Sequence, residues 1–139
     1  MPRRFGQAED TMPDGELSAA LSNAIVALMA EYTGRGVTQS RTFVNENLIT
    51  CIMHDSLTKG ERSLVADGKE HAVLEMRRAY QETMRPELIA IVERLTGRKV
   101  AAFMSANHVD PDVAVETFVL ELSESAADRK DDTGGHAPT

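Results

Sequence analysis

Two stretches of the chain carry apolar residues at helical spacing. In the first, at about residues 15–32, apolar positions recur every three or four residues, which predicts one buried stripe along a helix. Asp14 suits the N-cap of this helix and Gly34 its left-handed C-cap. The stripe consists of Leu17, Leu21, Ala24, Ile25, Leu28 and Tyr32.

The second helical stretch is longer and covers about residues 69–96. Pro86 lies inside it and has no amide hydrogen, so we expect a bend or a fresh helix start there. Before it, Thr58 and Glu61 have the spacing of a capping box and open a short helix that ends near Gly68. The buried stripe of the long helix consists of Val73, Tyr80, Met84, Leu88, Ile91 and Leu95.

Four shorter runs are rich in apolar and β-branched residues, which is typical of strands. They are residues 37–44, 48–54, 100–108 and 113–122. Turn-forming residues join the first run to the second and the third to the fourth, so we expect two hairpins. The order αββααββ predicts an α+β fold with a four-stranded antiparallel sheet covered on one face by helices.

The first helix is also poor in charge on the side opposite its stripe. A helix face in water usually carries several charged residues, whereas this one is made mostly of small or apolar side chains. We therefore expect a homodimer in which a second copy covers this face; the alternative is an exposed alanine-rich face that favours helix formation. The predicted interface consists of Ala19, Asn23, Val26, Ala27 and Ala30.

The length of 139 residues fits one domain, and the net charge of −7 argues against nucleic-acid binding, because an acidic chain gains nothing from counterion release. Residues 1–14 lack periodicity and residues 123–139 are polar and acidic. We expect both ends to be disordered tails around a domain at residues 15–122.

Cys51 is the single cysteine, which excludes an internal disulfide and cysteine-held metal clusters. Within a strand it is expected to be a small core residue rather than a nucleophile. No apolar run reaches the roughly 20 residues of a membrane span, and the first residues do not look like a signal peptide. We expect a cytoplasmic protein that does not insert directly into a membrane.

Arg77 lies in the middle of the apolar stripe of the long helix. A buried guanidinium without an acceptor is costly, so three interpretations remain open. Arg77 extends its head to the rim of the domain, pairs with Glu116 on the inward face of the last strand, or binds an anion. A small-anion or nucleotide site would combine Arg35, Arg41 and Arg77.

A second basic group lies on one flank of the same helix. Arg78 and Arg85 are seven residues apart and, with Lys99 and the arginines at 35 and 41, could attract a small anion. The glycines at 34 and 36 do not make a phosphate loop, since a longer glycine-rich loop is needed to point several amides at one phosphate. Because glutamates balance these charges, a solvated helix face is the alternative.

The chain offers little for catalysis or metal binding. His108, Asp110 and Asp112 look like ligands, but Asp-Pro-Asp is ordinary turn chemistry, and His54 is the only companion. Ser105 lacks the glycines of a nucleophile elbow. We therefore expect no catalytic residues, no metal and no cofactor.

Several segments together resemble one family. They are YTGRG (32–36), RTFVNENLI (41–49), LTKGERSLV (57–65), MRRAYQETMRPEL (76–88), LTGRKV (95–100), MSANHVDPD (104–112) and ETFVLEL (116–122). In order and spacing they resemble the MpsC family, named for a Na+-translocating membrane potential-generating system. The resemblance covers about residues 16–122 and implies a small bacterial domain of αββααββ order, linked to cation translocation and inorganic-carbon uptake.

The resemblance implies no catalytic residues. We therefore expect a non-enzymatic accessory or regulatory protein that acts as a homodimer by binding a protein partner, such as a membrane transporter. The alternative is a ligand-sensing module for a small anion or nucleotide.

Overall fold

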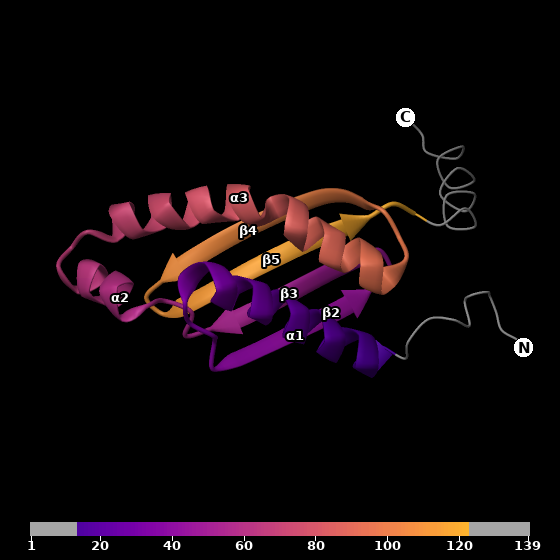
Figure 1. Ribbon diagram of the computed structural model, residues 1–139, viewed down its shortest axis with the longest axis horizontal. Helices are drawn as coiled ribbons and strands as arrows, with labels where there is room; N and C mark the ends of the chain where they lie inside the picture. The colour runs from indigo at the N-terminus through magenta and orange to yellow at the C-terminus, as the bar shows by residue number, and fades with distance from the viewer. Residues whose placement is uncertain (1–13, 123–139) are drawn as a thin grey trace, which may run out of the picture.

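A computed structural model describes residues 14–122 of the chain (Figure 1). The tails expected at residues 1–14 and 123–139 lie outside the described residues except for Asp14, which is not part of a tail but the first residue of a helix. In chain order the elements are α1 (Asp14–Thr33), β2 (Gln39–Asn45), β3 (Leu48–His54), α2 (Lys59–Ala66), α3 (Glu70–Thr96), β4 (Val100–Val109) and β5 (Asp112–Leu120). The predicted αββααββ order and α+β class are confirmed.

The four strands form one antiparallel sheet in the order β2-β3-β5-β4. Each predicted hairpin is present, and β5 pairs with β3 to join the two hairpins in the middle of the sheet. The helices pack on one face of the sheet, with α1 across β2 and α3 across β4 (Figure 1). The molecule therefore has two layers.

The α1 helix buries the stripe that its spacing predicts. Leu21, Ile25 and Leu28 are inaccessible or nearly so, and Met29 joins them. The helix ends at Gly34, whose φ of +75° is the left-handed conformation that glycine adopts without strain. Tyr32, in the last turn of α1, donates a hydrogen bond from its hydroxyl to Glu87 of α3, so the two long helices are tied together above the sheet.

Between the layers lies an aliphatic core with one aromatic pair. The rings of Phe103 and Phe118, on neighbouring strands, have centroids 5.0 Å apart. Met84, Leu88 and Val92 of α3 close the core from above. Their burial follows from the three-and-four spacing in the sequence.

The α3 helix is a single element of 27 residues, so the expected fresh start at Pro86 is wrong. The helix instead changes direction along its course (Figure 1). A proline leaves one backbone carbonyl without its donor, which a helix tolerates by bending. At its end, the Gly97 amide donates to the Glu93 carbonyl at 2.8 Å with φ of +71°, as a left-handed cap requires.

Candidate functional site

Arg77 is almost fully buried, with 1% of its surface exposed. Its Nε donates to Oε2 of Glu61 at 2.9 Å and its Nη2 donates to Oε1 at 2.6 Å. Two parallel bonds of this kind match the planar guanidinium to the planar carboxylate. Nη2 also donates to the carbonyl oxygen of Ser56 at 2.7 Å. The buried cation is therefore both neutralised and hydrogen-bonded.

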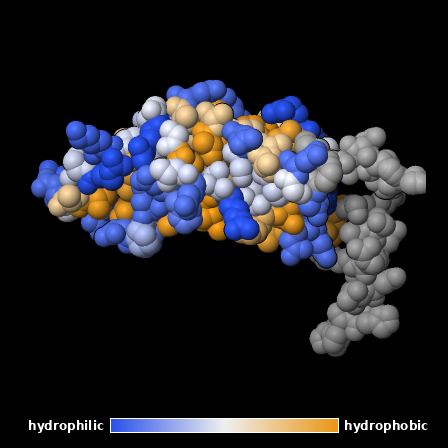
Figure 2. Space-filling view, turned by 90° about the horizontal axis from the view of Figure 1, so that it is seen from below, coloured by the Kyte–Doolittle hydropathy of each residue, from blue (hydrophilic) through white to orange (hydrophobic). Residues whose placement is uncertain are grey.

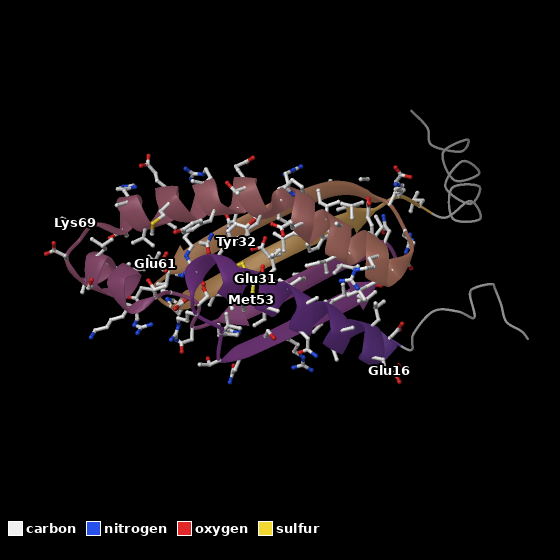
Figure 3. The ribbon with its side chains drawn as sticks, in the orientation of Figure 1. Glu16, Glu31, Tyr32, Met53, Glu61 and Lys69 are labelled. Atoms are coloured by element: carbon white, nitrogen blue, oxygen red, sulfur yellow. The ribbon has the colours of Figure 1, made fainter. Side chains whose placement is uncertain are left out.

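Glu61, labelled in Figure 3, caps the start of α2 and also binds Arg77 of α3. Its Oε1 accepts a bond from the Thr58 amide at 2.8 Å, and the Thr58 hydroxyl accepts one from the Glu61 amide at 3.1 Å. This is the predicted capping box. Burial alone would raise the pKa of Glu61, but the hydrogen bonds from Arg77 and Thr58 outweigh it and lower the pKa below 4.5. The carboxylate is thus charged at neutral pH.

Asp112 binds the loop between β3 and α2, which contains the Ser56 carbonyl that Arg77 also binds. Its Oδ1 accepts from the Ser56 amide at 3.1 Å and its Oδ2 from the Leu57 amide at 2.9 Å. The segment between β3 and α2 is therefore hydrogen-bonded both to Arg77 of the helical layer and to Asp112 at the β4–β5 turn. Three parts of the chain that are distant in sequence meet at these two residues.

The predicted pair of Arg77 and Glu116 is not formed, because Glu61 takes the guanidinium. Glu116 is buried, as its alternation along the strand predicts, with 0% exposed. Within residues 14–122 neither of its carboxylate oxygens has a hydrogen-bond partner. Burial raises the pKa of Glu116 to about 7, and the nearby Ser105 hydroxyl and Arg77 charge offset this only in part.

The three arginines of the expected anion site, Arg35, Arg41 and Arg77, each have contacts within the chain. Arg35 binds Asp55 after β3, with Nη2 2.8 Å from a carboxylate oxygen and Nε 3.2 Å from the carbonyl oxygen. Arg41 lies exposed on β2, with its guanidinium 5.4 Å from the ring centroid of Phe43. Arg77 is enclosed by its partners. Arg35 and Arg77 bind neighbouring residues, Asp55 and Ser56. The anion or nucleotide site expected at the three arginines stays a prediction.

The residues that resemble metal ligands have other partners. Nδ1 of His108 lies 2.8 Å from the carbonyl oxygen of Pro111, and Asp112 binds the loop amides. In the described part of the chain no three His, Cys, Asp or Glu residues gather as a metal site would require. Cys51 is inaccessible, and burial raises the pKa of its thiol.

A cavity of about 290 Å³ opens between α3 and β4. It is lined by Arg78, Gln81, Glu82, Arg85, Phe103, Met104 and Ser105. Gln81 is only 8% exposed, and within residues 14–122 its Nε2 and the Ser105 hydroxyl have no hydrogen-bond partner. Ser105 lies directly opposite the unpartnered Glu116 in the β4–β5 register. The Ser105 hydroxyl is close enough to lower the pKa of Glu116, and with Gln81 these residues form a buried polar group at this end of the interior.

Gln81 was missed by the sequence analysis, although a signal for it exists. It follows Arg77 by four residues, so it lies one turn further along the same buried face of α3. The two arginines expected on the flank of this helix, at 78 and 85, do line one cavity. Lys99 lies elsewhere, beside Gly97 and Arg98.

The second candidate surface is the outer face of the sheet, which no described helix covers. Four cross-strand rows form it: Gln39, His54, Val113 and His108; Arg41, Ile52, Val115 and Ala106; Phe43, Thr50, Thr117 and Met104; Asn45, Leu48, Val119 and Ala102. Nine of these sixteen residues are apolar and none is a carboxylate. We call this set the open sheet face. Its Phe43 and Met104 are 48% and 52% exposed.

A third candidate surface runs along α1 and the edge strand β2. A groove of about 450 Å³ lies between them, lined mostly by small and polar residues, with Arg41 and the large apolar Phe43 at β2. Ser22 and Thr42 hydroxyls share a hydrogen bond of 2.7 Å at its floor. Figure 2 views this side of the molecule and shows hydrophobic atoms reaching the surface among hydrophilic ones.

The predicted dimer face borders this groove. Ala19, Asn23 and Ala27 are exposed, whereas Val26 and Ala30 are half-buried within the chain itself. Dimerisation through these residues stays a prediction.

The fold and its surfaces define a two-layer α+β domain with one open sheet face. The family model for the Na+-translocating membrane potential-generating system (MpsC) matches residues 13–122, and the chain belongs to this MpsC family. Searches of curated proteins and of solved structures found no match. Among residues 14–122, no helix combines the length and hydrophobicity that crossing a membrane requires.

Replacing Arg77 by methionine leaves the Glu61 carboxylate buried without its cation. We expect Arg77→Met to lower the free energy of unfolding by about 3–5 kcal/mol. Urea denaturation followed by circular dichroism at pH 7 measures this. Arg78→Met, one residue along on the exposed side of α3, is the control and should change stability by less than about 0.5 kcal/mol. Equal stability of the two variants would show that the buried pair contributes nothing.

The raised pKa of Glu116 predicts a pH-dependent stability. Between its ordinary value of 4.5 and about 7, the folded state keeps a proton that the unfolded state releases. The free energy of unfolding therefore falls as pH rises through this window, by about 3 kcal/mol in total. Glu116→Gln should remove this slope and be more stable than the wild type at pH 8.

Urea denaturation at pH 5, 6, 7 and 8 provides the test. Glu75→Gln, an exposed substitution on α3, is the control and should keep the wild-type slope. If Glu116→Gln keeps the wild-type slope too, the Glu116 carboxyl group does not cause the pH dependence of stability.

Proposed function

We propose that the protein is a non-enzymatic, cytoplasmic accessory or regulatory protein that acts by binding other proteins. The observation that carries this proposal is the open sheet face. Soluble domains rarely leave a contiguous apolar surface of this kind in water, and such a patch usually marks an interaction site. An antiparallel sheet that faces water normally alternates apolar residues inside with polar residues outside, and here the outer rows are mostly apolar.

The size of this face supports a specific interface. Four strands spaced about 4.8 Å apart, with about eight residues of about 3.3 Å each, span about 20 by 25 Å. Covering that face buries on the order of 1,000 Å² over the two partners, which reaches the lower limit of specific protein interfaces. Its central row joins Ile52 to Val115 on the two inner strands.

The family name supports the choice of partner. The MpsC description refers to a Na+-translocating membrane potential-generating system, and we propose that a protein of such a system covers the open sheet face. We propose that the chain binds to the part of that system exposed to the cytoplasm.

We propose a homodimer through the third candidate surface, the outer side of α1. Small residues there allow close approach of a second helix, and β2 beside it is an edge strand whose free backbone groups can pair with another strand. The groove between α1 and β2 gives room for such a contact. Arg41 and Phe43 border both this groove and the open sheet face, and a dimer formed there leaves the rest of that face free for the partner.

The dimer is tested by light scattering of the wild type and Ala27→Arg. Because Ala27 is exposed in the single chain, the arginine should not unfold it, yet it places a charge in the proposed interface. We expect a dimeric wild type and a monomeric variant. Ala90→Arg, at an exposed alanine of α3, should remain dimeric. A monomeric wild type, or a dimeric Ala27→Arg, contradicts the assignment.

The partner surface is tested with Val115→Lys at the centre of the open sheet face. We expect binding to the purified cation-translocating complex of the same cell, measured by calorimetry, to weaken at least 100-fold, since a buried unpaired charge is costly. Ala79→Lys, an exposed substitution on α3, should bind like the wild type. Failure of the wild type to bind, or equal binding of both variants, argues against this function.

A further inference from the structure

The outer edge of β4 has features that the proposed function does not use. β4 is the last strand in the order β2-β3-β5-β4, so among residues 14–122 it has a strand partner on one side only. Every second residue of an edge strand points its backbone amide and carbonyl away from the sheet. From Ala102 to Val109 the pairing with β5 runs without interruption, and the one irregularity of this pair lies before Ala102. This stretch therefore presents a regular row of outward main-chain donors and acceptors.

The β4 edge lacks the usual protection. Natural proteins protect an edge strand by short length, charged side chains, proline or a bulge. β4 contains no Asp, Glu, Lys, Arg or Pro, and with 10 residues it is the longest strand of the sheet. The opposite edge, β2, is shorter, with 7 residues, and carries Arg41. An unprotected edge of this length either pairs with a further strand or leads to aggregation.

The helical layer leaves room beside this edge. On β5, Ala114 and Glu116 are fully buried beneath the helices, but Asn107 and Ser105, their direct neighbours on β4, are only half-buried. The cover that α3 provides therefore ends at β4 (Figure 1). The cavity of about 290 Å³ lies here, between residues 103–105 of β4 and side chains of α3. It gives space for side chains of an added strand.

The two sides of the edge differ, which defines the side chains of the added strand. On the open sheet face the new strand would lie beside Ala102 and Met104, which favour apolar neighbours. On the helical side it would lie beside the exposed Arg78 and Arg85 of α3, and Glu82 is the one carboxylate in the cavity lining. Successive residues of a strand point to opposite faces. A complementary segment therefore alternates apolar and acidic residues.

We propose that the edge of β4 binds an extended segment of another protein, with alternating apolar and acidic residues, as a fifth strand of the sheet. Main-chain hydrogen bonds to β4 supply the affinity, and the side chains on the two faces select the sequence. The proposal goes beyond the proposed function, because neither the open sheet face nor the α1 surface uses the backbone of β4.

Hydrogen exchange of the full ¹⁵N-labelled chain, followed by nuclear magnetic resonance at pH 6.5, tests the site. The probe is a capped synthetic peptide of about eight alternating Val and Glu residues, which matches residues 102–109 in length. Without it, we expect alternate amides of 102–109 to exchange fast. With it, they should exchange at least 10-fold more slowly, with a Kd on the order of 100 µM. Amides of β2 should not change.

Two N-methylated forms of the peptide test the main-chain pairing. One form is methylated on the Val amides and the other on the Glu amides. Because successive amides of a strand point to opposite edges, only one of these sets faces β4. We expect one form to bind at least 10-fold more weakly and the other to bind like the parent peptide.

Arg85→Glu tests the helical side of the edge. It reverses a charge beside the cavity, so the Val–Glu peptide should bind at least 5-fold more weakly, and a Val–Lys peptide should bind more tightly than it binds the wild type. Arg94→Glu makes the same change at an exposed position of α3 outside the cavity lining, and it should bind both peptides like the wild type. Both arginines are exposed, so both variants should fold.

Four results would overturn the proposal: no binding of the Val–Glu peptide, protection of β2 instead of β4, equal binding of the two methylated forms, or equal binding by Arg85→Glu and Arg94→Glu. These outcomes do not depend on the cation-translocating complex or on the dimer, because the probe is synthetic. Val115→Lys, which disrupts the open sheet face, should still bind the peptide like the wild type, so the two proposals fail separately.

Discussion

The buried ion pair of Arg77 and Glu61 is the constraint on which the arrangement of the helices depends. A guanidinium in the interior must have its acceptors supplied by nearby backbone and carboxylate oxygens, or the fold loses several kcal/mol. Glu61 can supply them only if α2 begins at Thr58 and lies against α3. Arg77 also binds the carbonyl oxygen of Ser56, whose amide donates to Asp112 at the start of β5. The loop after β3 is thereby held against the β4–β5 turn. One charge therefore sets the relative positions of α2, α3 and the β4–β5 turn.

The helices and hairpins were predictable because local chemistry determines them. The three-and-four spacing in α1 and α3, the capping box at Thr58 and the glycine caps each act over a few residues. Strand order was not predictable in this way, since pairing of β3 with β5 joins residues about 65 positions apart. At Pro86 the sequence left a bend and a fresh start open and could not decide between them, because packing of the whole stripe keeps the helix continuous.

The candidate site was predicted only in part, and its errors have physical causes. Periodicity correctly placed Arg77 and Glu116 in the interior, but it could not decide which acid pairs with the arginine. Glu61 had already been assigned to the helix cap, and nothing in the sequence indicates that one carboxylate performs both tasks. Gln81 carries no charge, so its place on the buried face of α3 does not by itself require an ion-pair partner. Its importance comes from a missing partner, which only three-dimensional contacts reveal.

The strand order affects how the protein folds while it is being synthesised. β5 is the last strand of the sheet to leave the ribosome, yet it occupies an inner position between β3 and β4. Until it emerges, the earlier hairpin and helices have no continuous sheet to cover, and their apolar faces stay exposed. Contacts of such long sequence separation form late and slowly. The nascent chain therefore needs protection from aggregation until nearly the whole domain has been made.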